Sequence, residues 1–162
     1  MARTNTPKQQ KAIGTADVCP PLEIDQQLCF ALYSTMLGMN KVYRELLKDL
    51  ALTYPQYLVM LVLWERDGLT VGEIAERVFL DSPTVTPLLK RLEAAGLISR
   101  DRSPQDERQV LITLTDAGRA LRKRSTHLPQ CIVDASDSDL SELMELRDRL
   151  LVLRERMARK AG

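Results

Sequence analysis

The sequence contains few of the side chains that build metal sites. His127 is the only histidine among 162 residues, and Cys131 shortly after it adds at most a second ligand on the same helical turn. Two ligands fall short of a zinc tetrad, so we expect no metal site. No glycine-rich phosphate loop and no Ser/His/Asp arrangement is readable either, and we expect no cofactor.

The sequence also lacks a long apolar run. None approaches the length of about 18 residues that can cross a membrane, and the polar N-terminus does not have the pattern of a signal peptide. These absences predict a cytoplasmic protein with no membrane partner. In that reducing compartment, Cys19, Cys29 and Cys131 are expected to be free thiols rather than parts of a disulfide framework.

Net charge is scarce as well, at a formal value of +1. A DNA-binding chain this close to neutrality must segregate its charges, and basic residues do outnumber acidic ones between Ser82 and Arg124. A solvated surface gives the same pattern, so charge supports DNA binding without deciding it. With 44% hydrophobic residues, the chain is predicted to form one domain over 22–162 after a flexible N-terminal tail at 1–21.

Residues 53–115 contain, in order, the parts of a winged helix-turn-helix. Three predicted helix starts follow one another, and each is marked by capping or first-turn residues. These are Thr53, Pro55 and Gln56, then Thr70 and Glu73, then Asp81 and Ser82. Gly68 is expected to end the first helix. Three capped helices in so short a segment predict a compact trihelical unit.

The third of these helices has two distinct faces. Its apolar residues recur at helical spacing and are predicted to be buried: Val85, Leu88, Leu89 and Leu92. Its other face is polar and carries the residues expected to contact DNA: Ser82, Thr84, Thr86, Lys90 and Arg91. Small hydroxyls first and cations later suit a helix whose N-terminal end enters a major groove, although an ordinary solvated helix is the alternative. A proline inside a helix costs about 3 kcal/mol, which favours a helix that is shortened or split at Pro87. Because Pro87 lies near the start of the segment, we expect the helix to continue through it.

A predicted β-hairpin follows this helix. Gly96 stops the helix, 97–100 is expected to be a strand, and 110–114 is a second strand rich in β-branched residues. The charged turn between them carries Arg102, Asp106 and Arg108, whose arginines could reach phosphates or a narrow minor groove. The predicted fold is therefore mainly α with a small β-wing.

The segments on either side of the winged unit, 22–52 and 116–162, are predicted to be dimerisation helices. Apolar residues alternate four and three apart along each of them. The two series are Leu28, Leu32, Thr35, Met39, Val42 and Leu46, and then Leu143, Leu146, Leu150, Leu153 and Met157. A monomeric bundle is the alternative, but a two-fold homodimer would explain the reading of an inverted-repeat operator in double-stranded DNA.

Cys29 is the candidate reactive residue. It is expected about one turn into a helix that starts near Asp25, where the helix dipole favours a thiolate by roughly 0.3 to 1 kcal/mol. That is too little to ionise a thiol at neutral pH, so further donors are needed. Tyr43 is fourteen positions later in the sequence, or about 21 Å along a straight helix. Only a partner crossing antiparallel near Met36 could bring such a phenol to Cys29, and an inert buried thiol is the alternative.

Four short segments resemble the MarR family, and within it the organic hydroperoxide resistance regulators. They are 52–57, 80–82, 86–93 and 106–108, and the similarity is close over about 26–115. Pro83 stands where these relatives are expected to have glycine. The resemblance implies that the helix runs through Pro87, that Asp106 and Arg108 help to position DNA, and that the terminal helices form a dimer.

The resemblance also implies roles around Cys29. It implies that Cys29 is reactive, that Tyr43 and Tyr54 of the partner subunit bond to it, and that Cys131 is the resolving cysteine; a passive thiol at Cys131 is the alternative. The expected function is a DNA-binding repressor released when an organic hydroperoxide oxidises Cys29. Three other functions are alternatives: a MarR-type repressor released by a non-covalent aromatic ligand, a thiol peroxidase and a plain dimeric interaction module. A thiol peroxidase usually has an activating arginine or a Thr-x-x-Cys setting, and Gln27 and Leu28 offer neither, so we expect no enzyme.

Overall fold

The computed structural model describes residues 22–102, 106 and 108–161. The predicted tail at 1–21, with Cys19, lies outside the described residues, as do positions 103–105 and 107 of the predicted wing. The chain divides into two compact units, 1–37 and 38–162, and each is described by itself. In the described part of the chain, no helix has both the length and the apolar character needed to cross a membrane.

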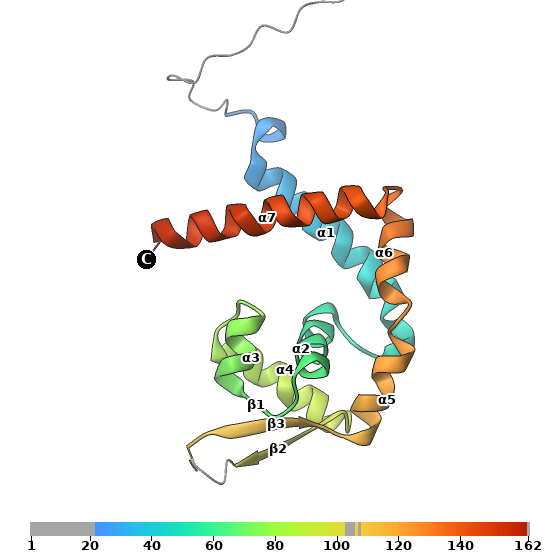
Figure 1. The fold of residues 1–162 in the computed structure, drawn as a ribbon, viewed down its shortest axis with the longest axis vertical. Coiled ribbons are helices and arrows are strands. Elements are labelled where there is room, and N and C mark those ends of the chain that lie inside the picture. The colour runs from blue at the N-terminus through green and yellow to red at the C-terminus, as the bar shows by residue number, and fades with distance from the viewer. Residues whose placement is uncertain (1–21, 103–105, 107, 162) are drawn as a thin grey trace, which may run out of the picture. The chain divides into compact units, whose positions relative to one another are not determined.

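The structure is mainly helical with one small sheet, which confirms the predicted fold class (Figure 1). The elements in chain order are η1 (Ile24–Gln26), α1 (Leu28–Leu46), η2 (Lys48–Leu50), α2 (Tyr54–Glu65), β1 (Leu69–Thr70), α3 (Val71–Arg77), α4 (Ser82–Ala94), β2 (Ile98–Arg102), β3 (Val110–Leu114), α5 (Asp116–Arg124), α6 (Leu128–Ser136) and α7 (Leu140–Ala161).

The first unit corrects the predicted start of the first long helix. That helix was expected to begin near Asp25, but Ile24–Gln26 form a 3₁₀ turn closed by Gln27 N donating to Ile24 O at 3.1 Å. Gln27 is extended, with φ −85° and ψ 122°, which separates the turn from α1. Cys29 is therefore the second residue of α1 rather than a turn inside it.

The predicted caps of the trihelical unit are confirmed in the second unit. Thr53 N donates to Gln56 Oε1 at 2.8 Å, and Thr70 N donates to Glu73 Oε2 at 2.8 Å, as capping boxes require. Thr84 N donates to Asp81 Oδ1 at 2.8 Å, so Asp81 is the cap and α4 begins at Ser82. Because caps are contacts between near neighbours in the sequence, they form wherever the helix forms.

Helix α4 passes through Pro87 without interruption, as the family resemblance implied. Its predicted apolar face is confirmed, since Val85, Leu88, Leu89 and Leu92 are all buried. Pro87 itself is exposed, and the Thr86 hydroxyl donates to Ser82 O at 2.7 Å one turn earlier. Pro87 has no backbone N–H to donate, so one helical hydrogen bond is missing near the helix start, on a side open to solvent.

The sheet has three antiparallel strands in the order β1-β3-β2. The prediction of a strand at 110–114 is confirmed, and β2 runs two residues beyond its predicted end, to Arg102. The sequence did not predict β1, because two residues are too few to show an alternating pattern. Its pairing of Leu69 with Ile112 joins the base of the wing to the loop after α2.

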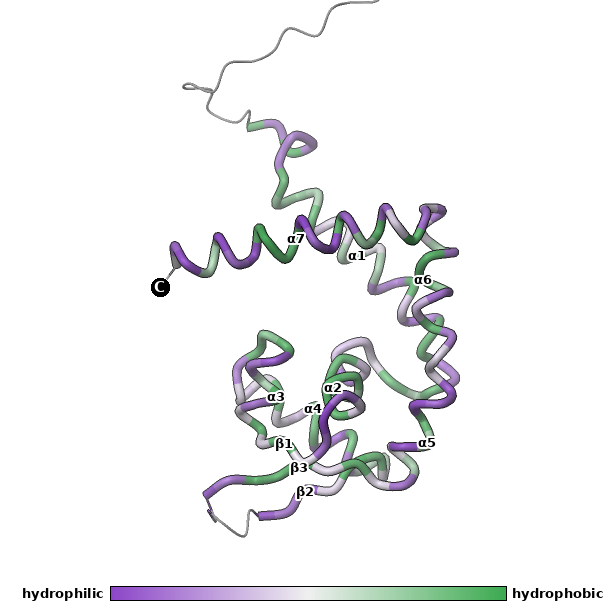
Figure 2. Tube along the Cα trace, in the orientation of Figure 1, coloured by the Kyte–Doolittle hydropathy of each residue, from purple (hydrophilic) through white to green (hydrophobic). Residues whose placement is uncertain are grey.

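Helix α2 is the centre of the core, and more than half of its twelve residues are buried. Figure 2 shows α2 as mainly hydrophobic, whereas hydrophilic turns recur along α7. Helix α5 packs against this core too: Leu121 is buried, and Trp64 Nε1 donates to Gly118 O at 2.9 Å. Gly118 lies so close to the end of α4 that a Cβ there would be 2.0 Å from Leu97 O.

We expect Gly118→Ala to destabilise the protein by about 1 to 3 kcal/mol, because a methyl group meets a backbone oxygen that cannot rotate away. Urea unfolding followed by circular dichroism measures the change. Gly72→Ala is the matched control, since the nearest atom to its Cβ is Thr70 Oγ1 at 4.0 Å. Unchanged stability of the Gly118 variant would contradict the packing.

Candidate nucleic-acid interface and thiol site

The polar face of α4 is open to solvent. Ser82, Thr84, Lys90 and Arg91 are exposed, while Thr86 is half-buried and its hydroxyl is bonded to Ser82 O. These side chains form one face because the opposite one is held in the core. A helix presenting small hydroxyls at its N-terminus and cations after them can contact base edges and phosphates of a major groove.

Asp106 bonds to the two residues that lead into β3. Its Oδ1 accepts a bond from Arg108 N at 3.0 Å, and its Oδ2 accepts one from Gln109 Nε2 at 3.1 Å. A carboxylate in a DNA interface would by itself repel phosphates. As an Asx turn, however, it sets the backbone from which the exposed Arg108 extends. Arg102 is exposed at the end of β2 and pairs in register with Val110 of β3.

Arg100 connects the wing to α4, a role that the sequence did not indicate. Its side chain is only 20% exposed, and its Nη1 lies 3.4 Å from Glu93 Oε2. In the sequence Arg100 looked like one more surface cation of the basic segment. The available signal was strand alternation, which places Arg100 on the same face of β2 as the buried Ile98.

A second tie holds the base of the wing. Asp67 Oδ1 accepts a bond from Leu114 N at 2.8 Å, and Asp67 Oδ2 lies 2.5 Å from Arg119 Nη1. Arg119 Nη2 also donates to Leu114 O at 2.7 Å. An isolated exposed ion pair stabilises little, but here both side chains also satisfy backbone groups where β3 ends and α5 begins.

Tyr43 and Tyr54 lie against each other in the second unit. Their ring centroids are 4.4 Å apart, and the Tyr57 ring lies 6.0 Å from that of Tyr43. Burial raises the pKa of Tyr43 from 10.0 to about 12, with the neighbouring tyrosines adding to the effect, and burial likewise raises the pKa of Tyr54 and Tyr57. All three phenols therefore remain protonated at physiological pH and can donate hydrogen bonds. Tyr57 was missed in the sequence, although its i+3 spacing from Tyr54 was the signal.

The two described cysteines each lie near a helix start. Cys29 is exposed at the second position of α1, where the amide groups of a first turn have no helical acceptor. Cys131 is half-buried in the first turn of α6, and its backbone N donates to His127 O at 3.2 Å. The structure brings Tyr43 and Tyr54 together in the second unit, and Cys29 belongs to the first.

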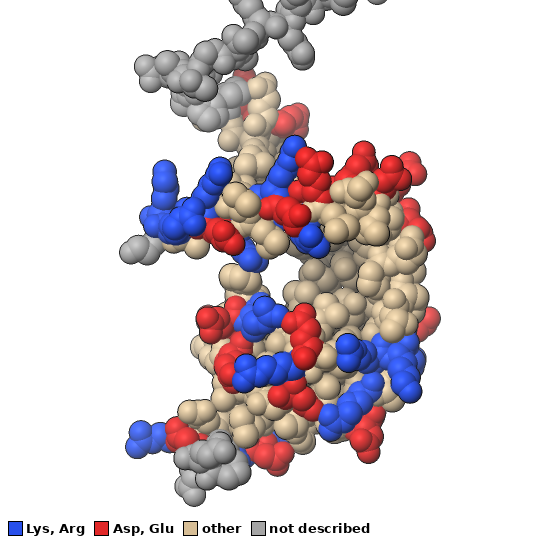
Figure 3. Space-filling view, viewed as in Figure 1, with Lys and Arg blue, Asp and Glu red and all other residues tan. Residues whose placement is uncertain are grey.

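Lys and Arg gather over α5 and over the C-terminal end of α7 (Figure 3). The exposed cations of α5 are Arg119, Arg122, Lys123 and Arg124. Of these, Arg124 Nη2 donates to Asp49 O at 2.6 Å, so it also secures the turn that follows α1.

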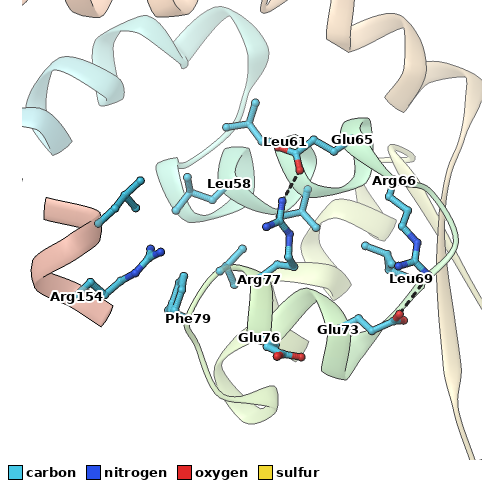
Figure 4. A pocket seen from close by; sticks show the side chains of 13 residues that line it. Leu58, Leu61, Glu65, Arg66, Leu69, Glu73, Glu76, Arg77, Phe79 and Arg154 are labelled. Carbon is cyan, nitrogen blue, oxygen red and sulfur yellow. Dashed lines mark hydrogen bonds and ion pairs between the residues drawn. The ribbon is translucent and has the colours of Figure 1, made fainter. Parts of the chain in front are cut away.

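A cleft of about 1130 Å³ lies between α2, α3 and α7 (Figure 4). Leu58, Leu61 and Leu69 contribute an apolar wall. Its arginines are engaged by neighbours: Arg77 pairs with Glu65, Arg66 pairs with Glu73 at 3.4 Å, and the Arg154 guanidinium lies 4.3 Å from the centre of the Phe79 ring. An anionic ligand in this cleft would have to displace one of these contacts.

These features together define a winged-helix regulator of transcription, and comparisons with known proteins identify its family. Residues 41–124 match the family model of the transcriptional regulator SarA/Rot. The HTH-type transcriptional regulator TtmR of Methylorubrum extorquens is 49% identical over 142 residues, which cover 88% of this chain and 73% of TtmR. The organic hydroperoxide resistance transcriptional regulator of Bacillus subtilis is 44% identical over 139 residues, which cover 86% of this chain and 95% of that protein.

A solved structure of reduced AbfR bound to DNA superposes with a TM-score of 0.70 at 34% identity, over 83% of this chain and 94% of AbfR. AbfR, from Staphylococcus epidermidis, has also been solved in an overoxidized form bound to DNA and in a disulfide form. The chain belongs to the MarR and SarA/Rot family of transcriptional regulators and is close to the organic hydroperoxide resistance regulators within it. This confirms the resemblance seen in the sequence.

We expect the stability of the protein to fall as the pH rises from 10 toward 12, and Tyr43→Phe to reduce that fall. The folded pKa of Tyr43, about 12, exceeds the ordinary value of 10.0, so its stabilisation is complete below pH 10 and is lost as the phenol ionises. Urea midpoints of both proteins across this range provide the measurement. Parallel curves for the two proteins would contradict the raised pKa.

Proposed function

We propose that the protein is a homodimeric repressor that releases an inverted-repeat operator when an organic hydroperoxide oxidises Cys29. The observation that carries this proposal is the pair of protonated phenols of Tyr43 and Tyr54, whose tilted rings lie against each other, in a chain 44% identical to an organic hydroperoxide resistance regulator. Cys29, at the start of α1, supplies a thiol that needs such donors.

Exposed apolar side chains on the two long helices support a dimer. Leu28, Leu32 and Met36 of α1 are exposed, as are Leu146 and Met157 of α7. Among the described residues of these two helices, none is buried in the single chain. Helices with so much apolar surface open to water need a partner, and a second copy supplies the same helices across a two-fold axis.

The dimer completes the thiol site. Cys29 and Tyr43 are fourteen positions apart in the sequence, which is about 21 Å on a straight helix. The phenols that bond to Cys29 of one protomer are therefore Tyr43 and Tyr54 of the partner subunit. Two neutral donors together with the helix dipole stabilise the thiolate, which is the nucleophilic form.

The reaction is a two-electron oxidation of sulfur. The Cys29 thiolate attacks the terminal oxygen of the hydroperoxide, an S–O bond forms as the O–O bond breaks, and the alkoxide leaves and takes a proton to become an alcohol. Cys29 becomes a sulfenic acid. The thiolate of Cys131 of the partner subunit then attacks that sulfur, so that an S–S bond forms as the S–O bond breaks, and the hydroxide that leaves takes a proton to become water. The disulfide form of AbfR supports this second step.

Oxidation removes the thiolate that the two phenols bond to, so the tyrosines lose their acceptor. Changing a mostly DNA-bound population into a mostly free one requires about 5.5 kcal/mol of differential stability, which a covalent change with rearranged packing can supply. A non-covalent aromatic ligand is the alternative effector. The cleft beside α7 is its candidate site, but the engaged arginines of that cleft make it a poor acceptor for an anionic ligand.

For DNA binding, we expect Lys90→Ala to lower the slope of log K against log salt by about 1, because one phosphate contact is lost. Fluorescence anisotropy with an inverted-repeat duplex at several salt concentrations gives the slope. Arg147→Ala is the control, since Arg147 is an exposed cation on α7 that pairs with Asp148. Equal slopes for the two variants would place the DNA interface elsewhere.

For the thiol switch, we expect Cys29→Ser to bind DNA like the wild type and to keep it after organic hydroperoxide is added. Cys131→Ser should still release DNA, but no crosslinked dimer should appear on a non-reducing gel. Gel shifts and non-reducing electrophoresis after a stoichiometric dose of cumene hydroperoxide test both statements. Release of DNA from Cys29→Ser by the peroxide would rule out the thiol switch and favour the non-covalent alternative.

A further inference from the structure

We propose that Tyr57 and Trp64 are positioning residues that couple the state of Tyr43 and Tyr54 to the winged unit. The proposal rests on the thiol switch described above and adds the route by which a change at the tyrosines reaches the DNA-binding surface. It is carried by a continuous row of aromatic contacts within the second unit, which runs from the half-buried Tyr43 and Tyr54 to the buried Tyr57 and Trp64. None of these contacts involves Cys29.

The row begins at the tyrosine pair. The ring of Tyr43 lies 4.4 Å from that of Tyr54 and 6.0 Å from that of Tyr57. The Tyr57 ring in turn meets the edge of Trp64 at 6.2 Å with an angle of 68° between the ring planes. Tyr57 and Trp64 are seven residues apart on α2, so they share one face of that helix. These separations lie within the range of favourable aromatic pairs.

The row ends where α4 meets the wing. Trp64 Nε1 donates to Gly118 O at 2.9 Å, and Gly118 is packed directly against Leu97 O. Leu97 lies between the end of α4 and the start of β2, and its carbonyl accepts a bond from Thr115 N at 3.1 Å. A shift of Trp64 would therefore change the packing at the point where α4, the wing and α5 meet.

The row is too tightly packed to absorb a displacement. Tyr57 is 4% exposed and Trp64 is 8% exposed, and Gly118 has no room for a methyl group. Close-packed interiors transmit strain and change between discrete arrangements rather than deforming gradually. When Tyr43 and Tyr54 lose their acceptor and move, Tyr57 and Trp64 carry that movement toward the base of the wing.

The chain offers its own reporter, because Trp64 is its only tryptophan. We expect the fluorescence emission of Trp64 in the full-length dimer to change when cumene hydroperoxide is added. The emission should change at the same rate as Cys29 is oxidised. The emission of Cys29→Ser should stay constant. If the wild type releases DNA on oxidation while the Trp64 emission is unchanged, the coupling proposal fails and the thiol switch stands. If Cys29→Ser also releases DNA, the thiol switch itself fails.

Variants at Tyr57 test the coupling directly, since Trp64 stays in place. In Tyr57→Leu, trapping of the sulfenic acid should show oxidation of Cys29 at the wild-type rate, while DNA release per oxidised Cys29 falls about fivefold. Tyr57→Phe keeps the ring and should restore wild-type release. Ile74→Val, a core change on α3 outside the row, controls for lost stability. If Tyr57→Leu releases as much DNA per oxidised Cys29 as the wild type does, the proposal is overturned. If Tyr57→Leu does not fold, the test is whether the Trp64 emission of the wild type and of Tyr57→Phe changes on oxidation of Cys29.

Discussion

Burial of α2 on more than one side is the constraint on which the rest of the structure depends. The helix contacts α3, α4 and α5, so it supports both α4, whose polar face is the proposed DNA contact, and α5, which follows the wing. It carries Tyr54, Tyr57 and Trp64 as well, which extend from its first residue almost to its last. Most of α2 is apolar and buried, with Leu61 and Glu65 exposed along one side, and a helix of this kind belongs in the core of a fold. Because α2 is shared in this way, we propose that a change at the tyrosines reaches the winged unit.

The proposed DNA-binding surface is built from groups that this core leaves outside. The core takes one face of α4, and the hydroxyls and cations of the other face stay in solvent. Backbone-directed side chains then fix the wing: Asp106 sets its turn, and Asp67 and Arg119 hold its base. Such bonds stabilise modestly in energy, but they set the direction in which exposed arginines point.

The proposed chemistry needs two chains because Cys29 and Tyr43 lie fourteen positions apart on one helix and cannot meet within a chain whose helix is straight. Tyrosines buried enough to keep their protons make good donors but poor nucleophiles, whereas a thiol at a helix start is accessible to an oxidant. Because the sulfur and the phenols meet only in the proposed dimer, oxidation of the sulfur changes contacts at the dimer interface. In the proposed dimer, this arrangement couples the state of the sulfur to the relation between the two DNA-binding halves.

The sequence alone determined the features that depend on near neighbours along the chain. The caps at Thr53, Thr70 and Asp81, the buried face of α4 and the strand at 110–114 were all predictable, because each is a contact or a periodicity within one segment. Only the tertiary structure decided the two-residue strand β1, the Arg100–Glu93 contact, the placement of Tyr57 against Tyr43, and the close approach of Gly118 to Leu97. The start of α1 also differed from its prediction, since a 3₁₀ turn and an extended Gln27 precede Leu28. These features were not predictable because each is set by packing geometry, which a pattern of residue types does not specify.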